Sequence, residues 1–411
     1  MRELKAMAYL PMACVNGEIL NRAGYDECTG VYLALEGLDL PDVADEPSKT
    51  QIVSAIKTIW QPWSGYKFAS ANDRAAMFAA ILTAVCRPAL HTAPGFIFDA
   101  PVQGSGKTKA ASALGALMRG ERVGVSPYVD GAGGEAETVK KLVSLAMSGT
   151  GFWLIDNVVG TWRSPALAAA ITEGQIDERV LGGNQWYRGV NRMMVVASSN
   201  NASLDRDLGR RFIRVRIDAG VECPQARSFS FDPVDMALTM RLAIAHNVLV
   251  LVRAYQLAGS PVAGRGDAGF SEWNRLVRSV VLWVQDAGFV ENADLDQFGD
   301  PAHSILEAAG ADDPDGEALR MLLLGLQIVF GDEPFIAREV QIIYADENLG
   351  SEGPALIREG LGGLVGHRRE VSVLSIGRAL KFRRDRIGGG LVLKFAGENR
   401  NGVSVWMVRN G

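Results

Sequence analysis

Short apolar runs alternate with helix-like stretches in the middle of the chain. Four of these runs have the length of buried strands, and segments with helical periodicity separate them; they cover residues 96–98, 152–155, 193–197 and 212–217. Strands joined by helical connections are typical of a parallel sheet. We therefore expect an α/β fold with a parallel sheet between about residues 95 and 218.

The segments on either side of this region have other patterns. Turn-forming pairs are frequent before residue 70, and a helical pattern follows with Asn72 as the expected N-cap. Helical periodicity returns over residues 236–257, 273–285 and 317–330, and two strand-like runs close the chain at 391–395 and 403–408. We expect an N-terminal region, an α/β core, a helical region and a C-terminal domain, over residues 1–70, 71–232, 233–333 and 334–411.

Composition indicates a globular protein that is not embedded in a membrane. Of the 411 residues, 48% are hydrophobic and 22% are charged, as in ordinary globular chains. A membrane-spanning helix needs about 18 apolar residues, and His246 and Asn247 interrupt the richest run. The N-terminus lacks the pattern of a signal peptide. Cysteines and histidines are few and scattered, so we expect no disulfide framework or metal cluster, and a cytosolic location.

Charge is distributed unevenly along the chain. The net charge is −5, but residues 361–411 contain ten Lys or Arg and three Asp or Glu, which gives +7 and leaves −12 for residues 1–360. A basic end on an acidic body is typical of a localised contact with a polyanion. A merely solvated basic face explains the charge equally well.

The strongest chemical signal is the segment FIFDAPVQGSGKT at residues 96–108. An apolar strand leads into a Gly-rich turn and then an Ala-rich helix, which is the setting that a phosphate-binding P-loop requires. Backbone amides of such a loop bind phosphate oxygens, and the helix N-terminus favours the negative charge. Pro101 stands where the first glycine of the usual motif would be. The phosphate-binding positions are all present: Gly104, Ser105, Gly106, Lys107 and Thr108. An ordinary Gly-rich turn is the alternative.

Two further strands end in polar residues that suit the same chemistry. The second apolar run ends in Asp156, 49 residues after Lys107, where a carboxylate would face Mg²⁺ at the sheet edge. The third run ends in Ser-Ser-Asn-Asn, so that Asn200 could orient water or contact a γ-phosphate. The next strand is preceded by Arg210 and Arg211, which could stabilise transition-state charge across a subunit boundary. A solvated arginine pair is the alternative.

These elements, in this order and spacing, resemble the AAA+ ATPases, and more closely the superfamily 3-type helicase modules of phage and prophage primase-helicase replication proteins. The resemblance covers most of the chain to about Gly259. Its matching segments are GYDECTG at 24–30, LTAVCRPAL at 82–90, APVQGSGKT at 100–108, LIDNVVG at 154–160, ERVLGGN at 178–184, SSNN at 198–201 and DLGRRF at 207–212. The resemblance implies an AAA+-type P-loop ATPase core that uses ATP and Mg²⁺.

The resemblance also implies a role for each matching residue. Lys107 and Thr108 match Walker A, and Asp156 matches Walker B, so that Thr108 and Asp156 would hold Mg²⁺ through the nucleotide. Asn200 matches sensor 1, and Arg210 and Arg211 match the arginine-finger region.

One position departs from the family pattern. Asn157 stands where many AAA+ enzymes have a catalytic glutamate. An amide cannot act as a general base, so either Glu135 or Glu137 takes that role or hydrolysis is slow.

Two segments are candidates for contact with DNA. Residues 179–192 have β-prone stretches around Gly-rich turns and predict a hairpin, which in related helicases enters the central pore. There Trp186 and Tyr187 could stack on bases while Arg188 or Arg192 contacts phosphate; packing of the aromatic rings against the sheet is the alternative. We place Arg188 at the loop tip.

The second candidate is the basic C-terminal segment. Residues 374–384 predict a helix with Arg378, Lys381 and Arg384 on one face, followed by two strands. This order resembles a winged helix, whose helix could enter the major groove of duplex DNA. Winged helices also bind proteins, and the +7 charge favours DNA.

The combined interpretation is an ATP-dependent DNA helicase of a phage or prophage replication system. We expect a homo-oligomeric ring, a hexamer, in the cytosol of a bacterial host. We expect single-stranded DNA in its pore, duplex DNA at its C-terminal domain and a separate primase as partner. The alternative is an initiator or helicase loader that uses ATP as an assembly switch. Asn157 favours the alternative, and the hairpin favours the helicase.

Overall fold

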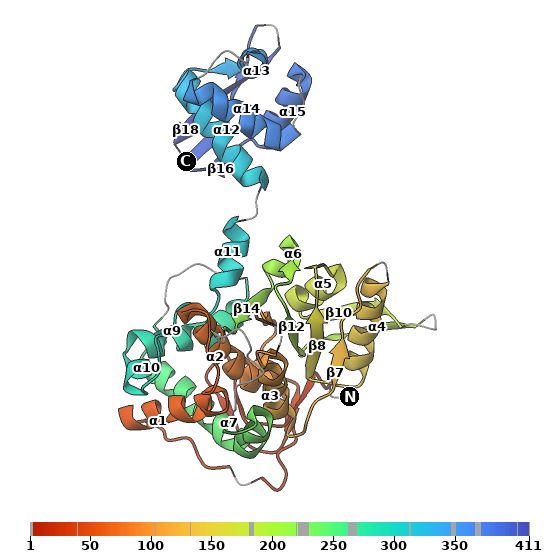
Figure 1. The fold of residues 1–411 in the computed structure, drawn as a ribbon, viewed down its shortest axis with the longest axis vertical. Coiled ribbons are helices and arrows are strands. Elements are labelled where there is room, and N and C mark those ends of the chain that lie inside the picture. The colour runs from red at the N-terminus through yellow and green to blue at the C-terminus, as the bar shows by residue number, and fades with distance from the viewer. Residues whose placement is uncertain are drawn as a thin grey trace. The chain divides into compact units, whose positions relative to one another are not determined.

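The chain forms two compact units, residues Met1–Ala309 and Gly310–Gly411 (Figure 1). The computed structural model describes residues 3–38, 40–102, 104–131, 133–180, 185–218, 220, 230–261, 269–311, 314–346, 351–365, 371–400 and 402–410. Each unit has its own apolar core. The second unit begins at Gly310, before the expected boundary at residue 333.

A five-stranded parallel sheet lies at the centre of the first unit. Its strands are β6 (Gly95–Asp99), β7 (Val125–Pro127), β8 (Phe152–Val158), β12 (Met194–Ser199) and β14 (Phe212–Arg216), in the spatial order β14-β6-β12-β8-β7 (Figure 1). All neighbouring pairs are parallel. The α/β class with a parallel sheet, expected from the apolar runs, is confirmed. This sheet is compatible with a P-loop core.

One helix precedes the first strand of this sheet and others connect its strands, as the alternating pattern requires. They are α2 (Ala71–Cys86), α3 (Lys107–Arg119), α4 (Gly134–Met147), α5 (Pro165–Glu173) and the short α6 (Arg206–Gly209). The N-cap of α2 is Ser70, whose hydroxyl accepts from the amide of Asp73, and not Asn72. The side chain of Asn72 instead accepts a hydrogen bond from the amide of Asp300, which ties α2 to the later helices.

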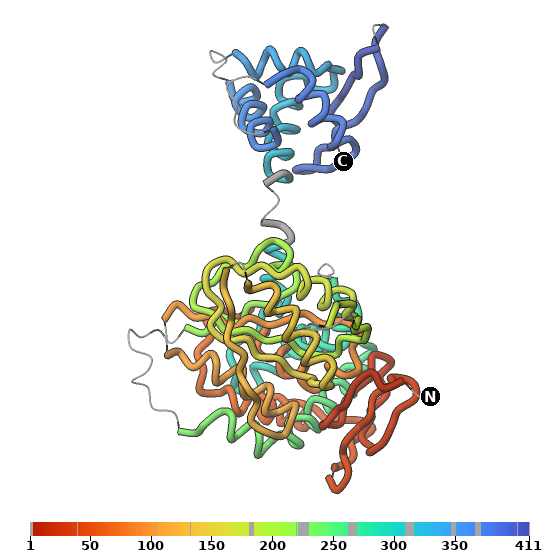
Figure 2. Tube along the Cα trace, turned by 90° about the vertical axis from the view of Figure 1, so that its right-hand side faces the viewer, coloured from red at the N-terminus to blue at the C-terminus, as the bar shows by residue number. Residues whose placement is uncertain are grey.

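The N-terminal region packs against this α/β core. It contains a three-stranded sheet of β1 (Ala6–Ala8), β5 (Val31–Leu33) and β4 (Gly24–Asp26), and the hairpin of β2 (Met12–Ala13) and β3 (Ile19–Leu20). These strands lie along one side of the first unit (Figure 2). Helix α1 (Lys49–Trp60) follows, with a capping box formed by Ser48 and Gln51. Its continuation, Gln61–Trp63, places the Trp63 indole where it donates to the carbonyl of Ala110 in α3, at 3.1 Å.

Helix α7 (Pro233–Leu257) is long and apolar enough to cross a membrane by length and composition alone. About half of the helix is packed inside the protein, including Ile244, Val248 and Leu251, each of which is fully buried. Burial of this kind is what a core helix requires. Helix α7 packs against α1 and α3.

The first unit ends in shorter helices. Residues Ser271–Asp286 form one helical stretch, α8 (Ser271–Trp273), a π-helical turn (Asn274–Arg278) and α9 (Ser279–Asp286), which confirms the helix expected at 273–285. Helices α10 (Phe289–Asn292) and α11 (His303–Ala311) follow.

The second unit has four helices and a four-stranded sheet among its described residues. The helices are α12 (Pro314–Phe330), α13 (Ala337–Ala345), α14 (Glu352–Val365) and α15 (Val373–Phe382). The sheet contains β15 (Phe335–Ile336), β16 (Ile387–Gly388), β17 (Leu391–Glu398) and β18 (Ser404–Asn410), in the order β15-β18-β17-β16. Both strands expected near the C-terminus are therefore present.

Close packing of α12 on α14 explains why α12 belongs to the second unit. A Cβ at Gly360 of α14 would lie 2.5 Å from the backbone nitrogen of Leu322, so only glycine permits this approach. Leu319, Leu322 and Leu326 of α12 are buried in the second core. The helix expected with the 233–333 region thus packs with the C-terminal elements.

Candidate functional site

Three side chains predicted from separate motifs meet at the carboxyl edge of the parallel sheet. Lys107 follows β6, Asp156 lies near the end of β8, and Asn200 directly follows β12. In parallel α/β sheets this edge is where ligands bind, because the strand ends and the helix N-termini converge there. The structure thus brings the predicted P-loop, the acidic strand end and the polar strand end into one site.

The Gly-rich turn has the backbone that a phosphate loop needs. Gly104 and Gly106 have φ values of +77° and +85°, in a region of backbone conformation that residues other than glycine rarely adopt. The Tyr66 hydroxyl donates to the carbonyl of Gly106 at 3.2 Å, and a Cβ at Gly106 would lie 3.1 Å from the Tyr66 ring. The hydroxyl of Ser105 is buried and has no hydrogen-bond partner among the described residues. The loop therefore has a free polar group inside a fixed turn.

Lys107 is the cation of the site. Its side chain is only 8% exposed, and its Nζ donates to the Oδ1 of Asn200 at 2.7 Å. Burial lowers the pKa of Lys107, while the carboxylates of Asp156 and Asp99 act in the opposite direction. A buried ammonium with one amide partner has donors left for a further anion, because it carries three N–H bonds.

Two hydroxyls surround the carboxylate of Asp156. The Oγ1 of Thr108 donates to its Oδ1 at 2.9 Å, and the Oγ of Ser198 donates to the same oxygen. Hydroxyl and carboxylate oxygens are the ligands that Mg²⁺ prefers. Thr108 and Asp156, both predicted, and Ser198, which the sequence analysis did not single out, are suited to hold such an ion.

Asn157 has an unusual backbone for a residue in a strand. Its φ is +61°, which asparagine tolerates better than most residues. Its amide donates to the Oγ of Ser198 at 3.1 Å, and its Oδ1 lies 3.5 Å from the Nδ2 of Asn200. The side chain of Asn157 therefore faces Asn200 at the site.

The two glutamates considered as replacement bases are engaged elsewhere. Oε1 of Glu135 accepts from the backbone amide of Ala166 at the start of α5, at 2.9 Å. Glu137 accepts from Lys140 at 3.0 Å on the surface of α4. Among the described residues, neither carboxylate forms a hydrogen bond with the strand ends that hold Asp156 and Asn200.

A cluster around Asp99 was missed in the sequence analysis. This last residue of β6 is fully buried, and its carboxylate accepts from Arg214 at 2.9 Å and Arg216 at 2.8 Å. It also accepts from the Ser199 hydroxyl at 2.8 Å and the Asn201 amide at 2.7 Å. The residues on either side of Asn200 are thus anchored to a charge on the P-loop strand.

Arg210 and Arg211 lie between α6 and β14. Arg210 donates to the Asp207 carboxylate at 3.1 Å and is 42% exposed, whereas Arg211 is 21% exposed and donates to the hydroxyl of Thr172 and the carbonyl of Asp207. The hydrogen bond from Arg210 is the leading cause that lowers the pKa of Asp207. Among the described residues, neither arginine bonds to Lys107 or Asp156 of its own chain.

The predicted hairpin is present, and its residues are arranged differently from the expectation. Strands β10 (Gln175–Arg179) and β11 (Trp186–Val190) are antiparallel; the turn at 181–184 is outside the described residues. Trp186 is 63% exposed, whereas Tyr187 packs against the core. Arg188 lies within β11 and not at the tip, and its Nε is 3.0 Å from the carboxylate of Asp177 on β10.

Arg192 is not brought to the surface with Arg188. It follows β11, is only partly exposed, and its guanidinium donates to the carbonyl of Leu90. Burial lowers its pKa. The physical reason is that the chain after the hairpin turns inward to enter β12.

The basic C-terminal residues lie on and after α15. Arg378 and Lys381 are exposed on the helix. Arg384 lies beyond the helix, which ends at Phe382, and it pairs with Asp385 at 3.2 Å and covers the Phe395 ring at 5.2 Å. Two of the three predicted cations therefore share a helix.

Comparison with known proteins gives neither a family nor a curated relative: no protein-family model matches the chain, and no curated protein matches it. Among solved structures, the apo form of the NrS-1 C-terminal region is similar at 12% identity and a TM-score of 0.42, covering 98% of this chain and 85% of that chain. The JCV helicase is similar at 15% identity and a TM-score of 0.29, covering 60% and 65%. Because these identities and TM-scores are low, any conclusion about function depends on the residues at the strand ends.

Proposed function

We propose that the chain is an ATP-dependent DNA helicase or translocase of a phage or prophage replication system, and that it acts as a ring of identical subunits. One observation carries the ATPase part of this proposal. Lys107 and Thr108, at the start of the helix after the Gly-rich turn, contact Asn200 and Asp156 from two neighbouring strands.

Each of these residues has a defined task when ATP and Mg²⁺ bind. Backbone amides of the turn and the N-terminus of α3 bind phosphate oxygens. Lys107 and Asn200, which share one hydrogen bond, would both turn toward the terminal phosphate. Asn200 would also orient the attacking water. Thr108 and Asp156 would hold Mg²⁺, and the ion would supply positive charge against the phosphates.

Completion of the site from a second subunit is part of the proposal. Arg210 is 42% exposed and lies after β12, so its guanidinium can leave Asp207 for the nucleotide of a neighbour. Arg211 is held by three acceptors of its own chain and positions this segment. A ring is the closed arrangement in which every subunit gives and receives such an arginine.

Contacts with DNA are assigned to the hairpin and to the second unit. The exposed Trp186 ring can stack on a base of single-stranded DNA in the pore, and Arg188 can exchange Asp177 for phosphate. In the second unit, helix α15 precedes the antiparallel strands β17 and β18, and β18 pairs with β15. That order supports a winged helix with Arg378 and Lys381 directed to duplex phosphates.

A second function is favoured by Asn157. Without a carboxylate next to Asp156, the chain is suited to bind ATP as an assembly switch, as an initiator or helicase loader does. The exposed Leu374 and Phe382 on α15, at 65% and 76%, fit a protein contact of the second unit. A separate primase in the cytosol of a bacterial host is the partner that this role suggests.

Strand displacement distinguishes the two functions. The full chain is mixed with a forked DNA duplex that carries a fluorophore and a quencher, with Mg²⁺ and ATP. A helicase separates the strands with ATP and does not with a non-hydrolysable analogue. Assembly on DNA that the analogue supports equally well, without strand separation, would favour the ATP-switched loader.

A further inference from the structure

A cavity of about 350 Å³ lies at the opposite edge of the parallel sheet from Lys107. Gly151 and Met193, which line it, directly precede β8 and β12, so the cavity is at the amino ends of these strands. The carboxyl-terminal residues of α2, α3 and α4 form its floor. Ligand sites commonly have volumes of about 300–1,000 Å³. The cavity is therefore large enough for a ligand and is separate from the phosphate site.

Two strand edges face this cavity. Every residue from 3 to 10 lines it, and so does every residue from 187 to 193. Side chains of a strand alternate between its two faces, so a cavity on one face would be lined by every second residue. Lining by consecutive residues means that the cavity meets the backbone edge of β1 and of β11.

Both edges lack a neighbouring strand. Among the described residues, β1 pairs only with β5, and β11 pairs only with β10. An open strand edge presents unpaired amide and carbonyl groups, to which an extended chain can add as a further strand. The cavity is a cleft between two such edges.

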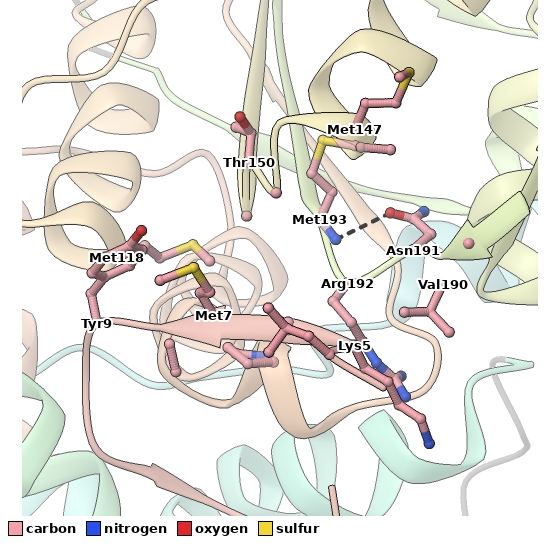
Figure 3. Close-up of a pocket in the computed structure, with 18 of the residues that line it drawn as sticks. Lys5, Met7, Tyr9, Met118, Met147, Thr150, Val190, Asn191, Arg192 and Met193 are labelled. Atoms are coloured by element: carbon pink, nitrogen blue, oxygen red, sulfur yellow. Dashed lines mark hydrogen bonds between the residues drawn. The ribbon is translucent and has the colours of Figure 1, made fainter. Parts of the chain in front are cut away.

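The apolar part of the cleft is made of methionines. Met7, Met118, Met147 and Met193 line it, four of the 12 methionines of the chain. Figure 3 shows Met7 of β1 and Met118 of α3 pointing toward each other. Met7 and Met147 are 36% and 56% exposed. Flexible thioether side chains that remain exposed are typical of surfaces that pack against the apolar side chains of a partner.

The charge of the cleft is positive. Lys5, Arg119, Arg188 and Arg192 line it, and Glu3 is its one acidic residue. Arg119 and Arg188 pair with Glu121 and Asp177. In the described part of the chain, no ion pair joins Lys5 to a carboxylate. Arg192 is partly buried, donates to the carbonyl of Leu90 and is attracted by Glu272. Figure 3 places Lys5 and Arg192 at one end of the pocket, apart from Met7 and Met118.

We propose that this cleft binds an extended, acidic and apolar segment of a partner protein, which adds as a strand to the edge of β1 or β11. Its apolar side chains pack on the methionines, and its carboxylates pair with Lys5, at the end of the cleft where Arg192 adds positive charge. Strand β11 has five residues, about 16 Å at about 3.3 Å per residue, so the segment pairs over about five residues. The inference depends on the open edges and the charge of the cleft, and it is independent of the function proposed for Lys107.

The test uses a fluorescein-labelled peptide of eight residues that alternates Asp with Leu or Val. A matched peptide has Lys in place of Asp, and a third has N-methylated amides at alternate positions, which removes the donors that strand pairing needs. We expect fluorescence anisotropy with the full chain to show binding of the acidic peptide about tenfold tighter than of the other two, or about 1.4 kcal/mol.

Protein variants show whether binding occurs in this cleft. Lys5→Glu and Met147→Asp should each weaken binding of the acidic peptide, whereas Lys49→Glu, an equal charge reversal at an exposed position outside the cleft, should not. Circular dichroism checks that all variants are folded. Equal binding by Lys5→Glu and Lys49→Glu, or equal binding of the acidic and basic peptides, would overturn the proposal. Self-association that Lys5→Glu abolishes, with no peptide binding, would assign the cleft to a second copy and also overturn it.

Discussion

Replacement of Asp99 tests how the site is held together. Its buried carboxylate accepts from Arg214 and Arg216 and from the two residues that flank Asn200. Asp99→Asn keeps the shape of the side chain and removes its charge. Asp99→Ala removes all four contacts and leaves both guanidinium groups without their carboxylate.

The expected cost follows from these contacts. Removal of one member of a buried ion pair costs about 3–5 kcal/mol. Arg214 and Arg216 are 30% and 36% exposed, so water can solvate their guanidinium groups in part after the carboxylate is removed. We therefore expect Asp99→Ala to lower the free energy of unfolding by about 3 kcal/mol. Asp99→Asn retains an acceptor for Ser199 or Asn201, and we expect about 1.5–2 kcal/mol, the value of hydrogen bonds to a charged group.

Urea denaturation of the full chain, followed by circular dichroism, measures the free energy of unfolding. The control is Asp294→Asn, because Asp294 is 85% exposed in its pair with Lys57; exposed pairs contribute at most about 1 kcal/mol. ATP turnover should also fall about tenfold in Asp99→Asn, equivalent to about 1.4 kcal/mol in the barrier, because Asn200 loses its anchored neighbours. Wild-type stability and wild-type turnover in Asp99→Asn would refute this reasoning.

Three further predictions concern separate parts of the molecule. Arg87→Leu should lower the free energy of unfolding by about 3 kcal/mol in urea denaturation, because the buried guanidinium donates to the carbonyls of Leu90, Asn191 and Met193 and a buried acceptor left without its donor costs about 1–3 kcal/mol; wild-type stability would contradict this. Asn157→Gly should keep or slightly raise stability and Asn157→Glu should lower it by about 1 kcal/mol, because the position has a φ of +61°; the reverse order would show that this backbone is not maintained. Arg378→Ala should weaken binding of duplex DNA and reduce the salt slope by about one, measured by anisotropy across a salt series; an unchanged slope would remove this residue from the DNA contact.

The sequence was sufficient for features that depend on neighbouring residues. The strand, Gly-rich turn and helix around Lys107 lie within one short segment, so local periodicity and glycine positions predict them. The end of β8 at Asp156 follows from the same kind of local pattern. Those elements meet because parallel strands share one carboxyl edge.

Features that depend on contacts between distant segments were not predictable. Ser198 bonds to Asp156 across 42 positions, and Asp99 bonds to Arg214 across 115. No local pattern distinguishes these residues from ordinary strand ends. Arg192 has the sequence neighbours of a hairpin cation, but it lies against Leu90, which is distant in the chain. Likewise α12 continues the helical region in sequence, and only its packing on α14 places it in the second unit.

ATP hydrolysis by the full chain, with and without single-stranded DNA, tests the central claim most directly. Lys107→Ala should abolish turnover or nucleotide binding, because the buried ammonium is the cation of the site. Lys109→Ala is the matched control, since Lys109 is also in the first turn of α3 but is 64% exposed and pairs with Asp232; its turnover should remain close to that of the wild type. Circular dichroism establishes that both variants are folded. Hydrolysis by Lys107→Ala at the wild-type rate would contradict the account.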